Sequence, residues 1–237
     1  ALAFNKAGVA IIGLGQGTLR PTFTFDTANT TTIAVSAASM SIQNCVFTGN
    51  FLSIATVFTL TTAKYFSVSN CEFEDTSAIL GFLSIITTSA TANAADGLRF
   101  NDNYVKSDAT TSSGPAIVLA GTINELEINR NLIVHTVATN NIAALLEHGA
   151  LVVSAARITW NYVYSINTDT ATGAILVKTT ATTGSGIIAH NRIRALDVAA
   201  AIVVPAAAVQ YGMFDNLYIG DGTMNSGFVL PAIGSDA

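Results

Sequence analysis

The sequence predicts an all-β protein, namely a right-handed single-stranded parallel β-helix (solenoid) of about eight coils. Two observations predict this fold. An eight-residue pattern recurs about every 25 to 32 residues, and short apolar strands follow one another with no helical periodicity between them. The composition agrees, because 50% of the 237 residues are hydrophobic, only 11% are charged and the mean hydropathy is +0.50. Such a chain can bury its apolar side chains in one continuous core, since each coil packs on the next.

The recurring pattern reads apolar, any, apolar, any, any, Asn or Cys, any, apolar. Its central residue stands at Cys45, Cys71, Asn103, Asn131, Asn161, Asn191 and Asn216. A side-chain amide at a coil corner can bond both its own loop backbone and the same residue of the neighbouring coil. We interpret these seven residues as a structural ladder, because an active site would be local and would not be repeated in every coil.

A second apolar strand recurs in the same rhythm, at Ala116–Leu119, 144–146, Ala174–Val177 and Ala201–Val204, with turn-forming residues between the strands. Each repeat therefore holds at least two short strands, and residues 1–237 are expected to form a single β-helix domain. The first coil begins almost at once, at Ala1–Phe4, so we expect no amphipathic N-terminal cap within this sequence. Residues upstream, or another chain, would then cover the first coil.

Composition argues against several classes of partner. The formal net charge is −5 and no run of Lys or Arg could neutralise a phosphate backbone, so nucleic acid is not expected as a partner. The longest apolar stretch, 198–209, is interrupted by Pro205 and is shorter than the roughly 20 residues that span a bilayer, so no membrane partner is expected.

No cofactor or metal is expected either, because His135, His148 and His190 lie too far apart in coil position to form an obvious site. Cys45 and Cys71 occupy one column of successive coils. In-register parallel stacking accommodates the near-90° torsion of a disulfide poorly, so we predict two buried free thiols.

The glycine-rich opening 8–17 and the segments Ile42–Phe47 and Val68–Phe73 resemble the right-handed, pectate-lyase-like parallel β-helix superfamily. The Ala- and Thr-rich style, as in 58–64, is more similar to β-helix proteins of tailed-bacteriophage virions than to pectinases. The resemblance implies a location in the virion. The glycines of 13–18 lack the third glycine and the following helix of a dinucleotide loop, so we interpret them as a coil corner.

Two groups of residues are candidates for glycan chemistry. Glycan-cleaving β-helices use outward carboxylates, and the densest acidic group comprises Glu72, Glu74 and Asp75, with Asp102 and Asp108 one coil later. Glu72 and Glu74 should point the same way, roughly 7 Å apart. The alternative, which we favour, is a solvated face partly neutralised by Lys106. A second group, Tyr104, Trp160, Tyr162 and Tyr164, would either stack on sugars or pack under loops or against a partner chain.

We therefore expect a non-enzymatic structural protein of a phage virion, either a head decoration or a tail component, that uses a rigid β-helix as scaffold. Its expected partners are other virion proteins and further copies of itself, with a trimer favoured. The alternative is a tail-spike-type polysaccharide depolymerase or a glycan-binding module that contacts a surface glycan.

The register yields its own prediction for the charged residues. If the apolar pattern positions point inward, then Arg99, Glu127 and Arg157 form an exposed charge ladder, and Glu74 faces Lys106 on the next coil.

Overall fold

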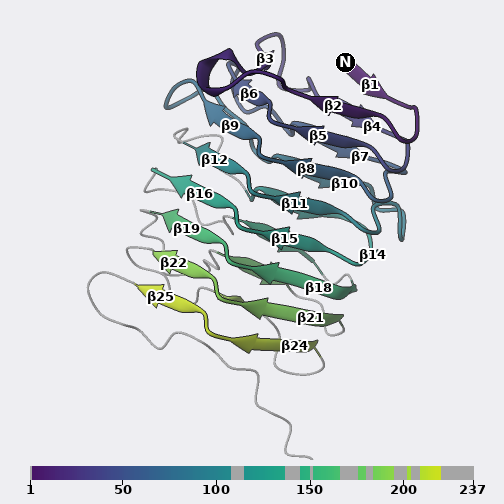
Figure 1. The fold of residues 1–237 in the computed structure, drawn as a ribbon, viewed down its shortest axis with the longest axis vertical. Helices are drawn as coiled ribbons and strands as arrows, with labels where there is room; N and C mark the ends of the chain where they lie inside the picture. Colours follow the sequence, from purple (N-terminus) through teal and green to yellow (C-terminus); the bar gives the residue numbers. More distant parts are fainter. Residues whose placement is uncertain are drawn as a thin grey trace, which may run out of the picture.

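The computed structural model describes residues 2–107, 115–136, 145–149, 152–165, 176–179, 184–194, 202–203 and 209–219. These residues form parallel strands in three sheets and one 3-10 helix, η1 (Gly17–Leu19), as Figure 1 shows. Each coil contributes a strand to the first, the second and the third sheet in turn, so successive coils stack along the long axis. Within the described residues, no helix has the length and apolar character needed to cross a bilayer.

We call the three sheets A, B and C. Sheet A contains, in stacking order, β1 (Leu2–Phe4), β4 (Ile33–Val35), β7 (Phe58–Leu60), β10 (Ile86–Thr88), β13 (Ile117–Leu119), β17 (Leu146–His148), β20 (Val177–Thr179) and β23 (Ile202–Val203). Sheet B contains β2 (Ala10–Ile12), β5 (Ser41–Gln43), β8 (Ser67–Ser69), β11 (Arg99–Asn101), β15 (Glu127–Asn129), β18 (Val153–Thr159), β21 (Gly184–Ala189) and β24 (Val209–Phe214), with β14 (Ile123–Asn124) beside β18. Sheet C contains β3 (Thr22–Phe25), β6 (Val46–Gly49), β9 (Glu72–Asp75), β12 (Tyr104–Ser107), β16 (Leu132–His135), β19 (Tyr162–Ser165), β22 (Arg192–Arg194) and β25 (Leu217–Ile219).

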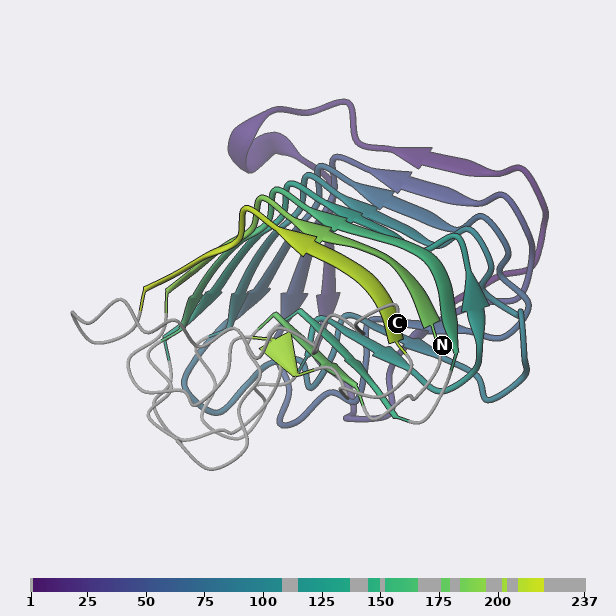
Figure 2. The same cartoon turned by 90° about the horizontal axis from the view of Figure 1, so that it is seen from below.

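This arrangement confirms the predicted all-β parallel solenoid, and Figure 2 shows the coils nearly superimposed when the molecule is turned by 90°. The sequence predicted at least two strands per repeat, and the structure has a third strand in each coil. The right-handed winding stays a prediction, based on the general preference for right-handed crossover connections.

The core consists of in-register columns of apolar side chains. In sheet C the rings of Phe23, Phe47 and Phe73 stack, with centroids 5.1 Å and 4.9 Å apart. In sheet B the in-register residues Ile42, Val68, Phe100, Ile128, Ile158 and Ile188 are fully buried. Each column repeats at the strand spacing of about 4.8 Å, so buried side chains of neighbouring coils can pack directly on one another.

Both corners that flank sheet B rely on a left-handed backbone conformation. The residue before each ladder position has φ between 53° and 59° in seven consecutive coils, at Asn44, Asn70, Asp102, Arg130, Trp160, His190 and Asp215. The corner between sheets A and B has a similar column at Ser39, Tyr65, Gly97, Glu125 and Ala155. Only Gly, Asn and Asp adopt this conformation readily, so tertiary contacts must stabilise it at Arg130 and Trp160.

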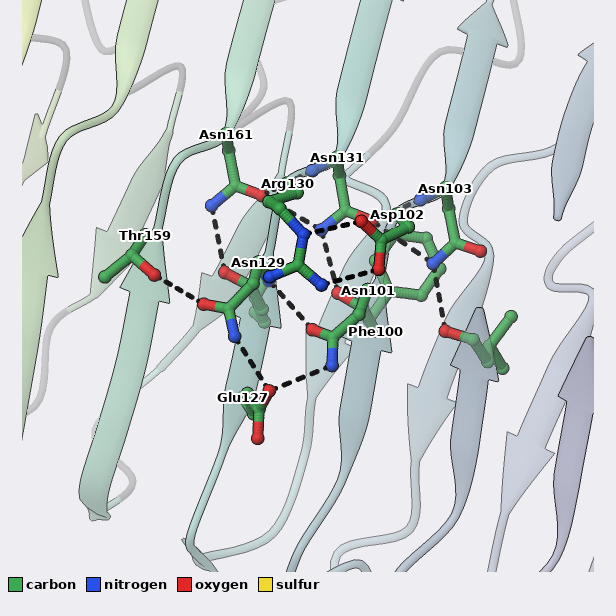
Figure 3. A network of polar contacts seen from close by, with 12 residues as sticks. Phe100, Asn101, Asp102, Asn103, Glu127, Asn129, Arg130, Asn131, Thr159 and Asn161 are labelled. Carbon is green, nitrogen blue, oxygen red and sulfur yellow. Dashed lines mark hydrogen bonds and ion pairs between the residues drawn. The ribbon is translucent and has the colours of Figure 1, made fainter. Parts of the chain in front are cut away.

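The asparagine ladder provides such contacts at the corner between sheets B and C (Figure 3). The Oδ1 atom of Asn161 accepts two hydrogen bonds from Asn131, one from its backbone N–H at 3.0 Å and one from the Nδ2 group of Asn131 at 2.9 Å. The Nδ2 group of Asn161 donates to the Ile128 carbonyl and to Asn191 Oδ1, both at 2.9 Å. The bond to the same residue of the neighbouring coil is therefore as the sequence predicts, whereas the backbone acceptor lies in the preceding coil and not in the residue's own loop.

The same bonds recur at Asn103, Asn131 and Asn191, and they end at Asn216. At the N-terminal end of the ladder, Cys71 takes the position that asparagine holds in the later coils. Its backbone N–H donates to Asn103 Oδ1 at 3.0 Å, and its Sγ lies 3.8 Å from the Ile42 carbonyl, the acceptor that an amide would use. The two cysteines therefore extend the column with a weaker donor.

We predict that Asn161→Ala lowers the free energy of unfolding by about 3 kcal/mol or more, because it leaves the buried N–H of Asn131 and the carbonyl of Ile128 without their partners. Urea denaturation followed by circular dichroism measures the loss. Asn216→Ala is the matched control, since Asn216 is half-buried at the end of the described ladder and water can replace its bonds, which limits the loss to about 1 kcal/mol. Equal losses in the two variants would contradict the role we assign to the ladder.

Candidate functional site

The glycine-rich segment after β2 forms a loop over the first strands of sheet C, β3, β6 and β9. Asn44 Nδ2 donates to the carbonyls of Gly13, at 2.6 Å, and Gly15, at 2.8 Å. A Cβ atom at Gly13 would lie 2.0 Å from the Asn44 carbonyl oxygen, so the close approach requires glycine there. These glycines therefore serve the packing of the loop on the next coil's corner.

This loop closes one side of two adjoining hollows. The first, of about 450 Å³, is lined by Gly17, Thr18, Arg20, Thr22, Val46, Glu72 and Glu74. The second, of about 520 Å³, is lined by Gly15, Gln16, Gly17, Arg20, Asn44, Asn70, Cys71, Asp102 and Tyr104. Both are open to solvent and share Arg20. The two hollows make the first strands of sheet C the candidate site for an extended polar ligand.

The carboxylates of the predicted acidic group differ in their surroundings. Glu72 forms an ion pair with Arg20, whose Nε donates to the Gly17 carbonyl at 3.1 Å. Glu74 accepts a hydrogen bond from Thr48 Oγ1 at 3.4 Å and lies in register with Lys106, as the sequence predicted. The sequence could not reveal Arg20 as the partner of Glu72, because the loop that carries it interrupts the repeat.

Asp75 does not belong to this outer face, which corrects our expectation. Its side chain is buried, where Oδ1 accepts from the Phe82 backbone N–H at 3.0 Å and Oδ2 from Ser107 Oγ at 2.9 Å. Strand alternation explains the difference, since Asp75 follows Glu74 directly and so points to the opposite side. Asp102 sits at the corner and pairs with Arg130, while Asp108 lies outside the described residues.

The pair of Asp102 and Arg130 links two coils across the surface of the corner. Nε and the second guanidinium nitrogen of Arg130 donate to the two carboxylate oxygens at 2.6 Å and 2.7 Å (Figure 3). Hydrogen bonding and the negative charge of Asp102 raise the pKa of Arg130 further. The pair is largely exposed, so its effect on stability is small.

The charged residues of sheet B lie in the predicted column. Arg99, Glu127 and Arg157 are in register on β11, β15 and β18, and Arg99 Nε lies 3.6 Å from Glu127 Oε2. The two arginines are exposed, but Glu127 is half-buried because Asn101 and Asn129 both donate to its Oε1, at 3.0 Å and 2.8 Å. The asparagine contacts were not expected, and they make Glu127 the centre of a network on this face (Figure 3).

The four candidate aromatic residues do not form one continuous strip. Tyr162 and Tyr164 point outward from β19, and Trp160 lies at the adjoining corner with 61% of its surface exposed. Tyr104 is separated from Tyr162 by the intervening strand β16, where Leu132 occupies the same column. The ring of Trp160 stacks on His190, with centroids 4.3 Å apart, and His190 Nδ1 lies 3.2 Å from Asp215.

The three histidines lie on separate elements, and within the described residues no group of three or more His, Cys, Asp or Glu side chains could hold a metal ion. His148 Nδ1 lies 3.0 Å from Thr179 Oγ1 in sheet A. His135 lines a small internal cavity, together with Asp75, Lys106 and Ser107. Burial lowers the pKa of His135 to about 4.

The cysteines are the two buried free thiols that the sequence predicted. Burial raises the pKa of both, and it raises that of Cys71 to about 12. Neither thiol has the exposure or the ionisation of a nucleophile.

Comparison with known proteins adds nothing to the fold, since no family model, no curated protein and no solved structure matches the chain significantly.

We predict that both thiols of the folded protein resist a bulky disulfide reagent at pH 8, because the reactive thiolate is scarce and covered. Labelling should proceed only after unfolding in denaturant, as absorbance of the released reagent would show. Ile187→Cys places a thiol at an exposed site of sheet B and should react rapidly in the folded state. Equally fast labelling of the native sequence would contradict burial of the column.

His135 should make stability depend on pH. Its pKa is about 4 in the folded state and about 6.5 in the unfolded chain, so the unfolded state binds the proton first as the pH falls. The stability due to the neutral ring is fully present above about pH 6.5 and decreases by roughly 3 kcal/mol on the way to pH 4.

Urea unfolding from pH 7 to pH 4 measures this dependence, and His135→Gln should reduce its slope. The carboxylate of Asp75 and the ammonium of Lys106 line the same cavity and stay in both proteins, so the difference between the two slopes isolates the imidazole. Identical slopes would contradict the assignment.

Proposed function

We propose that this chain is a non-enzymatic structural protein of a phage particle, in which a rigid solenoid carries or braces other virion proteins. One observation supports the proposal best, which is that the carboxylates near the candidate site already have polar partners within the chain. Glu72 pairs with Arg20, Asp75 anchors Phe82 and Ser107, and Asp102 pairs with Arg130.

A structural role also accounts for the distribution of polar contacts. The ladder repeats one set of hydrogen bonds through consecutive coils, and the network around Glu127 joins neighbouring strands of sheet B. Groups used in this way stiffen the rod along its axis. An exterior with few charges further favours partners that cover part of it.

A polysaccharide depolymerase is the second candidate, and the two open hollows beside Glu72 and Glu74 favour it. Arg20 and Tyr104 at their margins would suit contacts with a polar chain. Hydrolysis by two carboxylates would need one acid and one base on either side of a glycosidic bond. The ion pair of Glu72 with Arg20 argues against such a role.

Mass spectrometry of purified particles from the phage that encodes the chain tests the structural proposal. We expect the protein in mature particles, at hundreds of copies if it decorates the head or at a handful if it belongs to the tail. Its absence from intact particles would overturn the proposal.

Incubation of the purified protein with host capsular or O-antigen polysaccharide separates the two candidates. We expect no release of reducing ends. Release that is lost in Glu72→Gln or Glu74→Gln, but kept in Glu125→Gln at a distant corner, would instead establish the depolymerase.

A further inference from the structure

The outer face of sheet C carries two columns of side chains whose order is self-complementary. The first column, from β6 to β25, reads Val46, Glu72, Tyr104, Leu132, Tyr162, Arg192 and Leu217. The second reads Thr48, Glu74, Lys106, Val134, Tyr164 and Arg194. Both columns pass through β16, at Leu132 and Val134. The acidic residues lie on β9, two coils before β16, and the two arginines lie on β22, two coils after it.

From this order we propose that two copies of the chain associate through the outer faces of sheet C, about a two-fold axis that runs along β16. Rotation by 180° about this axis reverses the order of the coils. Each column of one copy therefore lies against the same column of the other copy, read in the opposite direction. Glu72, which also pairs with Arg20 of its own copy, then meets Arg192 of the second copy, and Glu74 meets Arg194. Tyr104 meets Tyr162, Lys106 meets the ring of Tyr164, and Leu132 and Val134 meet their own equivalents on the axis.

The centre of this face has the character of an interface core. Leu132 and Tyr162 expose 40% and 41% of their surfaces to solvent, although both are large and mostly apolar. Val134 and Tyr164 lie beside them in register. An apolar and aromatic centre with charged residues at its margins is the usual anatomy of protein interfaces. Lys106 opposite an aromatic ring adds a cation–π contact.

The basic margin has no ion-pair partner among the described residues. Arg192 and Arg194 are exposed, and neither forms an ion pair with any residue in the described part of the chain. Arg194 lies over the ring of Tyr164, with its guanidinium carbon 5.5 Å from the centroid. In a chain of net charge −5, these two arginines have their complement in the acidic coils of a reversed copy.

A trimer of parallel solenoids, which the sequence led us to expect, would not use this pattern. Parallel rods bring equal coils to the same height, so the acidic strand β9 would lie level with β9 of its neighbours. Only reversal of the coil order brings the acidic strand opposite the basic one. The charge order therefore favours the two-fold arrangement.

The area of the face sets the expected strength. Sheet C measures roughly 35 Å along the stack and about 13 Å along the strands, or about 450 Å² per copy. Two such faces bury roughly 900 Å², which is the range of weak interfaces. We therefore expect a dimer with a dissociation constant in the micromolar range.

Sedimentation of charge-reversal variants tests the proposal. Glu74→Arg and Arg194→Glu should each weaken self-association by about tenfold or more, because each places like charges opposite one another at two symmetric contacts. An equimolar mixture of the two variants should restore the native affinity, since both contacts of the mixed dimer then join opposite charges. Arg157→Glu, which makes the same charge change on sheet B, should leave the association unchanged.

A bismaleimide cross-linker gives a second measurement that does not depend on charge. Leu132→Cys should be cross-linked to a dimer, because the axis places this position against itself, whereas Ile187→Cys on sheet B should stay uncrosslinked. A native protein that stays monomeric at millimolar concentration, a native trimer, or a mixture that fails to regain affinity would each overturn the proposal.

Discussion

The hydrogen bonds between successive asparagines are the interaction on which the rest of the structure depends. They join equivalent corners of adjacent coils through both backbone and side chain, for example between Asn131 and Asn161. Because side chains alternate across a strand, a slip of one residue would bury Arg99 and Glu127 and expose Phe100. The ladder thus fixes which residues form the core and which are presented to solvent.

The same ladder explains how unfavourable residues are tolerated at the corner. Arg130 and Trp160 adopt a left-handed conformation that costs roughly 1 kcal/mol or more for such side chains. The buried amides on their C-terminal side hold the backbone there regardless of the residue type. The corner column is therefore free to vary, and its side chains interact with one another outside the core, as the rings of Trp160 and His190 do.

Much of this fold could be predicted from the sequence, because a repeated pattern reports the register directly. The ladder positions, the column of Arg99, Glu127 and Arg157, and the pairing of Glu74 with Lys106 all follow from one alignment of the repeats. The surroundings of the site could not be predicted in this way. Arg20 reaches Glu72 from a loop outside the repeat, and Asp75 is buried because its partners, Phe82 and Ser107, come from an irregular loop and from the next coil.

The two outer faces differ in how far apart the opposite charges of their columns lie. On sheet B, Arg99 and Glu127 stand on adjacent coils, so the pair and its two asparagine donors form a closed network. On sheet C, Glu72 and Arg192 are four coils apart, about 19 Å at the strand spacing, which exceeds the screening length of physiological salt. A rigid solenoid cannot bend to bring them together. In the proposed dimer, Arg192 and Arg194 meet opposite charges on the second molecule, and the rigidity that the ladder provides keeps them in position to do so.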